Sequence, residues 1–135
     1  MKNMMNDCVL IAKKNNIPFK WNEKFPINSL NLMRGFLLIS DNQKDRYFDA
    51  CFNAYWKNNI DISKDENVKK ILIDCEISYD LFSSGCKDQN IKEKLKRLTN
   101  DAFNKDIFGA PTFVINNKIF WGQDRLDYAL DEYNL

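Results

Sequence analysis

The stretch FGAPTFVINNKIFWGQDRL, residues 108–126, decides the fold of this chain. In it, the breaker cluster Gly109-Ala110-Pro111 is followed by two short apolar runs, residues 112–115 and 118–121, with Asn116-Asn117 between them. Two β-branched or aromatic runs around a two-residue turn are typical of a β-hairpin, and asparagine tolerates the left-handed backbone that such a turn requires. The sequence therefore predicts a hairpin at this point.

One helix is predicted after the hairpin, over residues 124–133. Leu126, Ala129, Leu130 and Tyr133 share one helical face, and Asp124 occupies the position where an N-cap belongs.

The part of the chain before the hairpin is predicted to be helical. The whole sequence has only four glycines and three prolines, and its first hundred residues show no clean two-residue alternation of apolar side chains. Two capping-box patterns, Ser40 with Gln43 and Ser63 with Glu66, mark helix starts. From these starts and from apolar spacings of three and four, we expect helices over residues 4–15, 29–39, 40–55, 63–75, 79–84 and 88–105.

Length and charge limit the class of protein. The chain has 135 residues, which is the usual size of one domain and enough to bury a core without disulfides or a structural metal. Its 20 Lys and Arg and 19 Asp and Glu are interspersed and give a net charge of +1, which argues against nucleic acid and membrane as partners. The N-terminal apolar run, residues 8–12, is too short for a signal peptide, so we expect a soluble, cytoplasmic protein.

The available reactive side chains are few. The absence of histidine excludes Ser-His and Cys-His nucleophile pairs and every histidine-containing metal site. The four cysteines form no C-x-x-C pair, and we expect Cys8, Cys51 and Cys75 to be core residues. Cys86 lies beside a glycine and a lysine, so we expect an exposed thiol; the alternative is a thiolate that the ammonium favours. No metal site is expected.

An aromatic stripe and a basic run each have two possible interpretations. The aromatic stripe of Phe48, Phe52 and Tyr55 is expected in the core, although aromatic side chains also form stacking surfaces. The basic run that contains Lys92, Lys94, Lys96 and Arg97 is expected to be the solvated face of an amphipathic helix.

The hairpin stretch resembles the C-terminal part of the 2-hydroxychromene-2-carboxylate isomerase family, which is close to kappa-class glutathione transferases and belongs to the DsbA-like thioredoxin-fold group. A second block, Ile17-Pro18-Phe19, residues 25–30 and Met33-Arg34-Gly35, is similar to the family's entry into its helical insertion. The implied fold class is α/β and predominantly helical. Residues 1–106 would form the helical insertion with its lead-in helix, and residues 107–135 the C-terminal hairpin and helix of the thioredoxin fold, together one structural domain.

The resemblance implies half of a glutathione site around the proline. It implies that the Ala110–Pro111 bond is cis and that Ala110 turns its backbone N–H and C=O toward a thiol-containing peptide, which adds like a strand. The alternative is an ordinary trans proline at the start of a strand. Gln123 and Asp124 match the family positions that hold the γ-glutamyl end of glutathione, where helix N–H groups favour its carboxylate and Asp124 meets its ammonium. Considered without the family, Asp124 is only an N-cap.

Two more residues have both a family interpretation and a plain one. Asn28 matches a family active-site asparagine that faces glutathione or substrate, whereas the sequence by itself makes it the N-cap or turn residue before the second helix. Trp121 is expected in the core rather than against a ligand.

The chain also departs from the family. Its members open with a strand, a loop that carries the serine hydrogen-bonded to the glutathione sulfur, a helix and another strand. We find no counterpart of this region in the sequence, so no catalytic residue is nominated and we expect the chain alone to lack turnover. An incomplete sheet would also favour a homo-oligomer or complementation by an N-terminal chain.

The activity implied is that of a glutathione-dependent isomerase, in which the thiol adds reversibly to a small, unsaturated aromatic substrate. Two alternatives stay open. One is a non-catalytic remnant or interaction module, and the other is part of a DsbA-like thiol-disulfide oxidoreductase.

Overall fold

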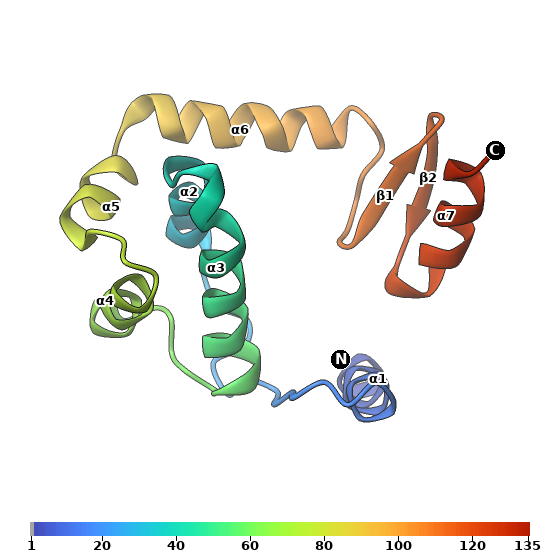
Figure 1. The fold of residues 1–135 in the computed structure, drawn as a ribbon, viewed down its shortest axis with the longest axis horizontal. Helices are drawn as coiled ribbons and strands as arrows, with labels where there is room; N and C mark the ends of the chain where they lie inside the picture. Colours follow the sequence, from blue (N-terminus) through green and yellow to red (C-terminus); the bar gives the residue numbers. More distant parts are fainter. Residues whose placement is uncertain (1) are drawn as a thin grey trace. The chain divides into compact units, whose positions relative to one another are not determined.

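A computed structural model of the chain describes residues 2–135 and contains mostly helices (Figure 1). The elements follow in the order α1 (Lys2–Lys14), α2 (Leu30–Leu38), α3 (Asp41–Phe52), a π-helical turn (Asn53–Lys57), α4 (Asp65–Asp74), α5 (Tyr79–Gly85), α6 (Gln89–Phe103), β1 (Thr112–Ile115), β2 (Lys118–Trp121), a 3-10 turn (Gln123–Arg125) and α7 (Leu126–Tyr133). The predicted helices and the hairpin are therefore present, with ends that differ by a few residues. The chain forms two compact units, Met1–Leu95 and Lys96–Leu135.

The core of the first unit is made where α2, α3, α4 and α5 meet. Its members include Leu32, Tyr47, Leu72 and Phe82, each at most 9% exposed. The Tyr47 hydroxyl, at the centre of this core, donates to the Leu32 carbonyl at 2.9 Å. A buried hydroxyl needs such a partner, and here the bond also ties α3 to α2.

The connection before α2 is held by one buried amide. Asn22 is 1% exposed, and its Nδ2 donates to the carbonyls of Tyr55 at 2.9 Å and Ile60 at 3.1 Å. These carbonyls lie in and just after the π-helical turn, where the regular helical bonding pattern ends. Around the amide, Trp21, Phe25 and Trp56 pack with ring centroids 5.0–5.8 Å apart.

The predicted capping boxes are wrong, although helices do begin near them. Ser40 precedes α3, but its hydroxyl donates to the Gln43 side chain at 2.7 Å and caps no backbone N–H. Ser63 donates to Asp61, and α4 begins only after Lys64. The helix that has a serine cap is α5, where the Leu81 N–H donates to Ser78 Oγ at 3.4 Å. The neighbouring side chains compete for these hydroxyls, and the capping pattern does not reveal that.

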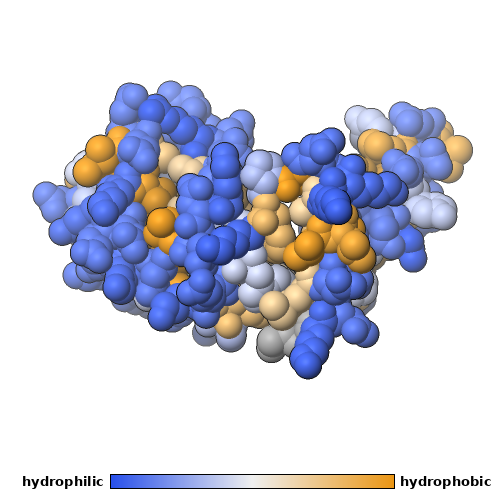
Figure 2. Space-filling model, turned by 90° about the horizontal axis from the view of Figure 1, so that it is seen from below, coloured by the Kyte–Doolittle hydropathy of each residue, from blue (hydrophilic) through white to orange (hydrophobic). Residues whose placement is uncertain are grey.

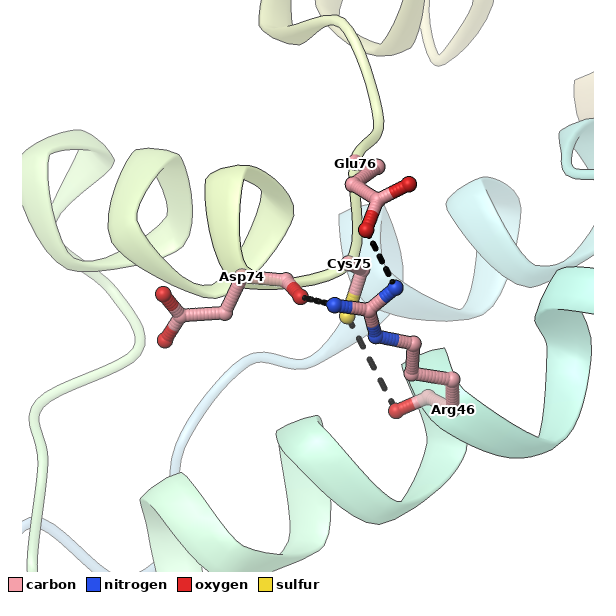
Figure 3. Close-up of polar contacts among 4 residues, drawn as sticks. All are labelled: Arg46, Asp74, Cys75 and Glu76. Carbon is pink, nitrogen blue, oxygen red and sulfur yellow. Dashed lines mark hydrogen bonds and ion pairs between the residues drawn. The ribbon is translucent and has the colours of Figure 1, made fainter.

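Arg46 of α3 forms hydrogen bonds with the C-terminal end of α4 (Figure 3). Its guanidinium donates to the Glu76 carboxylate at 2.9 Å and to the Asp74 main-chain carbonyl, while the Asp74 carboxylate points away from it. The Cys75 thiol donates to the Arg46 carbonyl at 3.7 Å. Glu76 has a φ of 59°, the left-handed conformation that often ends a helix. Arg46 thus satisfies a carbonyl that the helix leaves without a partner.

The second unit contains the hairpin and α7, which lies along it (Figure 1). Strands β1 and β2 are antiparallel, with Thr112 opposite Trp121 and Ile115 opposite Lys118. Asn116 and Asn117 have φ values of 50° and 61°, so the predicted two-residue turn is confirmed. Lys118 forms an ion pair with Glu132 of α7 at 2.6 Å, which shows that this face of the hairpin is the one that α7 covers.

The molecular surface agrees with the interspersed charges of the sequence. Hydrophilic residues cover most of the face in Figure 2, and hydrophobic residues appear in separate groups. On α6 the basic residues Lys94, Lys96 and Arg97 are exposed as predicted, whereas Lys92 is half-buried. Within residues 2–135, none of the helices has both the length and the apolar character needed to span a membrane.

Candidate functional site

The predicted cis proline is confirmed: the Ala110–Pro111 peptide bond is cis. The Pro111 carbonyl accepts a hydrogen bond from the Gly122 N–H at 3.0 Å, which extends the hairpin by one pair. Ala110 is exposed, and neither its N–H nor its C=O has a hydrogen-bond partner within residues 2–135. Its backbone is therefore free to pair with an extended peptide, as the resemblance implies.

Gly109 is needed because the Trp121 side chain lies against it. A Cβ atom on Gly109 would come within 2.5 Å of Trp121 Nε1. The ring of Trp121 also packs on Phe108, with centroids 5.0 Å apart. Trp121 is nevertheless 52% exposed, so the prediction that it is a core residue is wrong. The Trp121 side chain projects from the face of the hairpin opposite α7. Successive residue pairs alternate between the two faces, so the Thr112–Trp121 pair lies on the face opposite the Ile115–Lys118 pair, which is on the α7 side.

Gln123 and Asp124 form the 3-10 turn that leads into α7, and both are exposed. The prediction that Asp124 caps the helix is wrong, since Arg125 holds that position and no side chain caps α7. Instead, the Asp124 carboxylate forms an ion pair with Arg125 at 3.0 Å. It also lies above Gly122, whose φ is 108° and where a Cβ would come within 2.5 Å of Asp124 Oδ1. The positive φ is what favours glycine there.

Four of the five candidate ligand-binding residues are thus brought together at one end of the hairpin. The Gly122–Pro111 hydrogen bond places Ala110-Pro111 beside the turn that carries Gln123 and Asp124. No hydrogen bond within residues 2–135 uses the N–H of Gln123 or of Asp124, so this end presents free donors, with the Asp124 carboxylate beside them. Free N–H groups at the start of a helical segment favour an anion.

The fifth candidate, Asn28, lies in the other unit, before α2. Its Oδ1 accepts the Leu30 N–H at 2.9 Å, so the interpretation as a turn residue at the helix start is confirmed. The side chain is exposed, and its Nδ2 has no partner within residues 2–135. Contact of Asn28 with glutathione or substrate stays a prediction.

The first unit also contains an apolar pocket of about 380 Å³. Phe48 and Phe52 of α3 stack at a centroid distance of 4.3 Å and line it together with Phe25, Met33 and Trp56. The two phenylalanines are 47% and 51% exposed, so the prediction that they are core residues is wrong. The i and i+4 spacing that placed them on one stripe does not distinguish a core from the wall of a pocket. The cis bond between Phe25 and Pro26, at the mouth of this pocket, was also not predicted.

Burial disfavours the thiolate form of three of the four cysteines, Cys51, Cys75 and Cys86. Burial raises the pKa of Cys51 to about 11, and it also raises the pKa values of Cys75 and Cys86. Cys86 is 4% exposed and its thiol donates to the Asn31 carbonyl at 3.3 Å, so the expectation of an exposed thiol is wrong. Its sequence neighbours suggested a loop, but the chain turns Cys86 into the core at the end of α5. Within residues 2–135, no group of three acidic, cysteine or histidine side chains is placed to hold a metal.

Comparisons with known proteins agree with this arrangement. The model of the DSBA-like thioredoxin domain family matches residues 1–134. A 2-hydroxychromene-2-carboxylate isomerase from Sphingobium xenophagum is 24% identical over the whole chain, and one from Pseudomonas sp. (strain C18) is 27% identical over 62% of it. The solved structure of a 2-hydroxychromene-2-carboxylate isomerase superposes with a TM-score of 0.85 over 96% of the chain, at 21% identity.

These proteins are longer than the chain. The alignments cover 68% of the Sphingobium protein, 40% of the Pseudomonas protein and 64% of the solved structure. The family match spans nearly every residue, and the structural likeness gives the same fold. The chain belongs to the DSBA-like thioredoxin domain family.

Proposed function

We propose that this protein is a glutathione-dependent isomerase of the 2-hydroxychromene-2-carboxylate isomerase type, with a small, unsaturated aromatic substrate. The observation that carries the proposal is the end of the hairpin, where the free backbone of Ala110 lies beside the free N–H groups of Gln123 and Asp124. The names of the relatives support the reaction class.

The groups at the hairpin end fit the parts of glutathione. The N–H and C=O of Ala110 would pair with the backbone around its cysteine, as one strand pairs with another. The N–H groups of Gln123 and Asp124 would hold the γ-glutamyl carboxylate, and the Asp124 carboxylate would meet the ammonium in competition with Arg125. Each of these contacts leaves the sulfur free.

Bound glutathione would supply a thiolate that adds to an unsaturated carbon of the substrate and is later eliminated, so that it is not consumed. The contacts at the hairpin end would orient that thiol. The first unit contains an apolar pocket, with Phe48 and Phe52 in its wall, whose lining suits the face of an aromatic ring. No described side chain is assigned to lowering the pKa of the thiol.

A calorimetric titration of the chain with glutathione tests the binding half of the proposal. We expect a dissociation constant of about 1 mM, because a few charge-assisted and backbone hydrogen bonds contribute only about 0.5–3 kcal/mol each. S-methylglutathione is expected to bind equally well, since the contacts avoid the sulfur. Asp124→Ala should weaken both ligands roughly tenfold, whereas the control Asp127→Ala, an exposed residue in the first turn of α7, should not.

Isomerisation of 2-hydroxychromene-2-carboxylate tests the catalytic half. We expect no turnover by the chain with glutathione alone and turnover when the opening strand-loop-helix-strand segment of a relative is added. Binding that never leads to turnover would instead identify a non-catalytic interaction module. If glutathione does not bind, or if Asp127→Ala weakens it as much as Asp124→Ala, the hairpin end is not the site.

A further inference from the structure

The first unit contains a second, larger cavity of about 630 Å³ that the proposed function does not use. It lies between the start of α2, α4, α5 and the start of α6, and its lining combines apolar residues with polar and charged ones. We call it the cationic pocket, after the three cations that line it, which are Arg34, Lys87 and Lys92.

None of these three cations is neutralised by the chain. The ion pairs within residues 2–135 involve none of them. Arg34 is half-buried, and its Nε–H is fully shielded from solvent without a hydrogen-bond acceptor in the described chain. Its Nη1 reaches only Asn31 Oδ1, at the long distance of 3.4 Å. A shielded guanidinium donor without an acceptor is costly, and proteins rarely leave one unless a ligand, water or ion completes it.

One carboxylate also lines the cavity. Asp65 lies at the start of α4. Burial first, and then this carboxylate, raises the pKa of Tyr79, which also lines the cavity. Three cations therefore face one carboxylate in the lining. These three cations and one carboxylate give the lining a net charge of +2, which is more than the net charge of +1 of the whole chain.

Neutral donors complete the lining. Asn28, whose Nδ2 has no partner within residues 2–135, and Ser83 of α5 both line the cavity. Planar, fixed Arg donors together with flexible Lys ammonium groups are the set that binds carboxylate and phosphate oxygens. The volume is of the order that takes a small organic molecule rather than a single ion.

We propose that the cationic pocket binds the anionic group, a carboxylate or a phosphate, of a small molecule. Arg34 would be the central ligand, because its guanidinium lines the cavity, is half-buried and takes part in no ion pair within residues 2–135. Lys87, in the loop after α5, and Lys92, in the first turn of α6, would supply further positive charge to bind the anion. The site is distinct from the glutathione contacts at the hairpin end, which belong to residues 96–135.

Titration with inorganic phosphate and, separately, with benzoate tests the proposal on the whole chain. Nitrogen-15 NMR follows the Nε–H resonance of Arg34 at constant ionic strength, which removes general screening by salt. We expect a saturable shift with at least one of the two probes, and the stronger probe identifies which anion the pocket prefers. Arg34→Gln and Lys92→Gln, followed by calorimetry, should each weaken that probe by roughly tenfold.

Lys94→Gln is the matched control, because Lys94 lies on the same helix as Lys92 but is exposed and outside the cavity. It should change the affinity by less than about twofold. If Arg34→Gln fails to fold, Lys92→Gln decides the result. The proposal is overturned if neither probe shifts Arg34 Nε–H saturably, or if Lys94→Gln weakens binding as much as Lys92→Gln.

Discussion

At the scale of single residues, Gly35 shows how closely the first unit is packed. A Cβ atom at this position of α2 would overlap the ring of Phe82 and lie 2.8 Å from the Tyr47 hydroxyl oxygen. Ring atoms held in a core cannot move aside as the end of a flexible side chain can. The glycine in the Met33-Arg34-Gly35 block is therefore explained by the approach of α5 and α3 to α2.

Gly35→Ala is expected to lower the free energy of unfolding. Overpacking costs about 1–3 kcal/mol or more, which outweighs the gain of up to about 1 kcal/mol from the better helix propensity of alanine. Urea unfolding monitored by circular dichroism measures the difference. Gly85→Ala is the matched control, since its Cβ would meet the end of one flexible side chain, Leu38, whose methyl carbons lie at 2.7 Å and whose Cγ lies at 3.3 Å. An equal loss in both variants would show that Phe82 yields as easily as Leu38.

The sequence predicted some residues correctly and others not, for reasons that differ by site. Asn28 and Asn116-Asn117 were correct because their conformation is decided by the nearest few residues. Asp124 and Cys86 were wrong because distant or competing contacts decide them: Arg125 takes the helix-capping position from Asp124, and Cys86 is buried with the distant Asn31 carbonyl as the acceptor of its thiol. Local chemistry is readable from sequence, whereas burial depends on how the elements pack.

At the scale of elements, one acidic side chain of α7 contacts both the turn and a strand of the hairpin. Glu132 of α7 accepts from Lys118 at 2.6 Å and from Asn116 Nδ2 at 3.0 Å. It therefore holds both the turn and strand β2 against the helix. Hydrogen bonds from Lys118 and then Asn116 lower the pKa of Glu132 below its usual value of 4.5.

The stability that Glu132 contributes should depend on pH. Because its pKa is lower in the folded than in the unfolded state, the contribution is present above pH 4.5 and is lost as the pH falls through the folded pKa. Glu132→Gln should therefore have a lower Tm than the natural sequence at pH 7, and the two Tm values should converge in acid. Glu66→Gln, an exposed residue in the first turn of α4, is the control. A difference in Tm that stays constant with pH would contradict this role.

The elements themselves were more predictable than their ends. Six helices, the hairpin and the last helix followed from apolar spacing and from Asn116-Asn117, because these patterns report which face is buried. Ser40 precedes α3 as predicted, whereas the start of α4 was less predictable, since Asp61 competes for the Ser63 hydroxyl. The π-helical turn after Phe52 was not foreseen, and it depends on bonds from Asn22, more than thirty residues away along the chain.

At the scale of the whole molecule, one face of the hairpin is only partly covered by its own unit. The alternation of β1 and β2 puts Val114, Ile119 and Trp121 on the face opposite α7, where they are 38–52% exposed. Phe108, next to Trp121, is 74% exposed. Within the described residues, the sheet has two strands, so each strand also has one edge without a partner. Exposed apolar faces and open edges of this kind favour association.

The purified chain is therefore expected to sediment above its monomer mass of 16.0 kDa. The association should weaken in Val114→Thr/Ile119→Thr, because threonine keeps the β-branched shape that a strand favours but removes apolar surface from this face. Tyr133→Ser is the control, since Tyr133 is 74% exposed but belongs to α7, which covers the other face. Sedimentation velocity at several concentrations separates the cases. A soluble monomer at every concentration would show that the exposed face does not drive association. Association that persists in the double variant but is lost in Tyr133→Ser would place the contact on the α7 side of the hairpin.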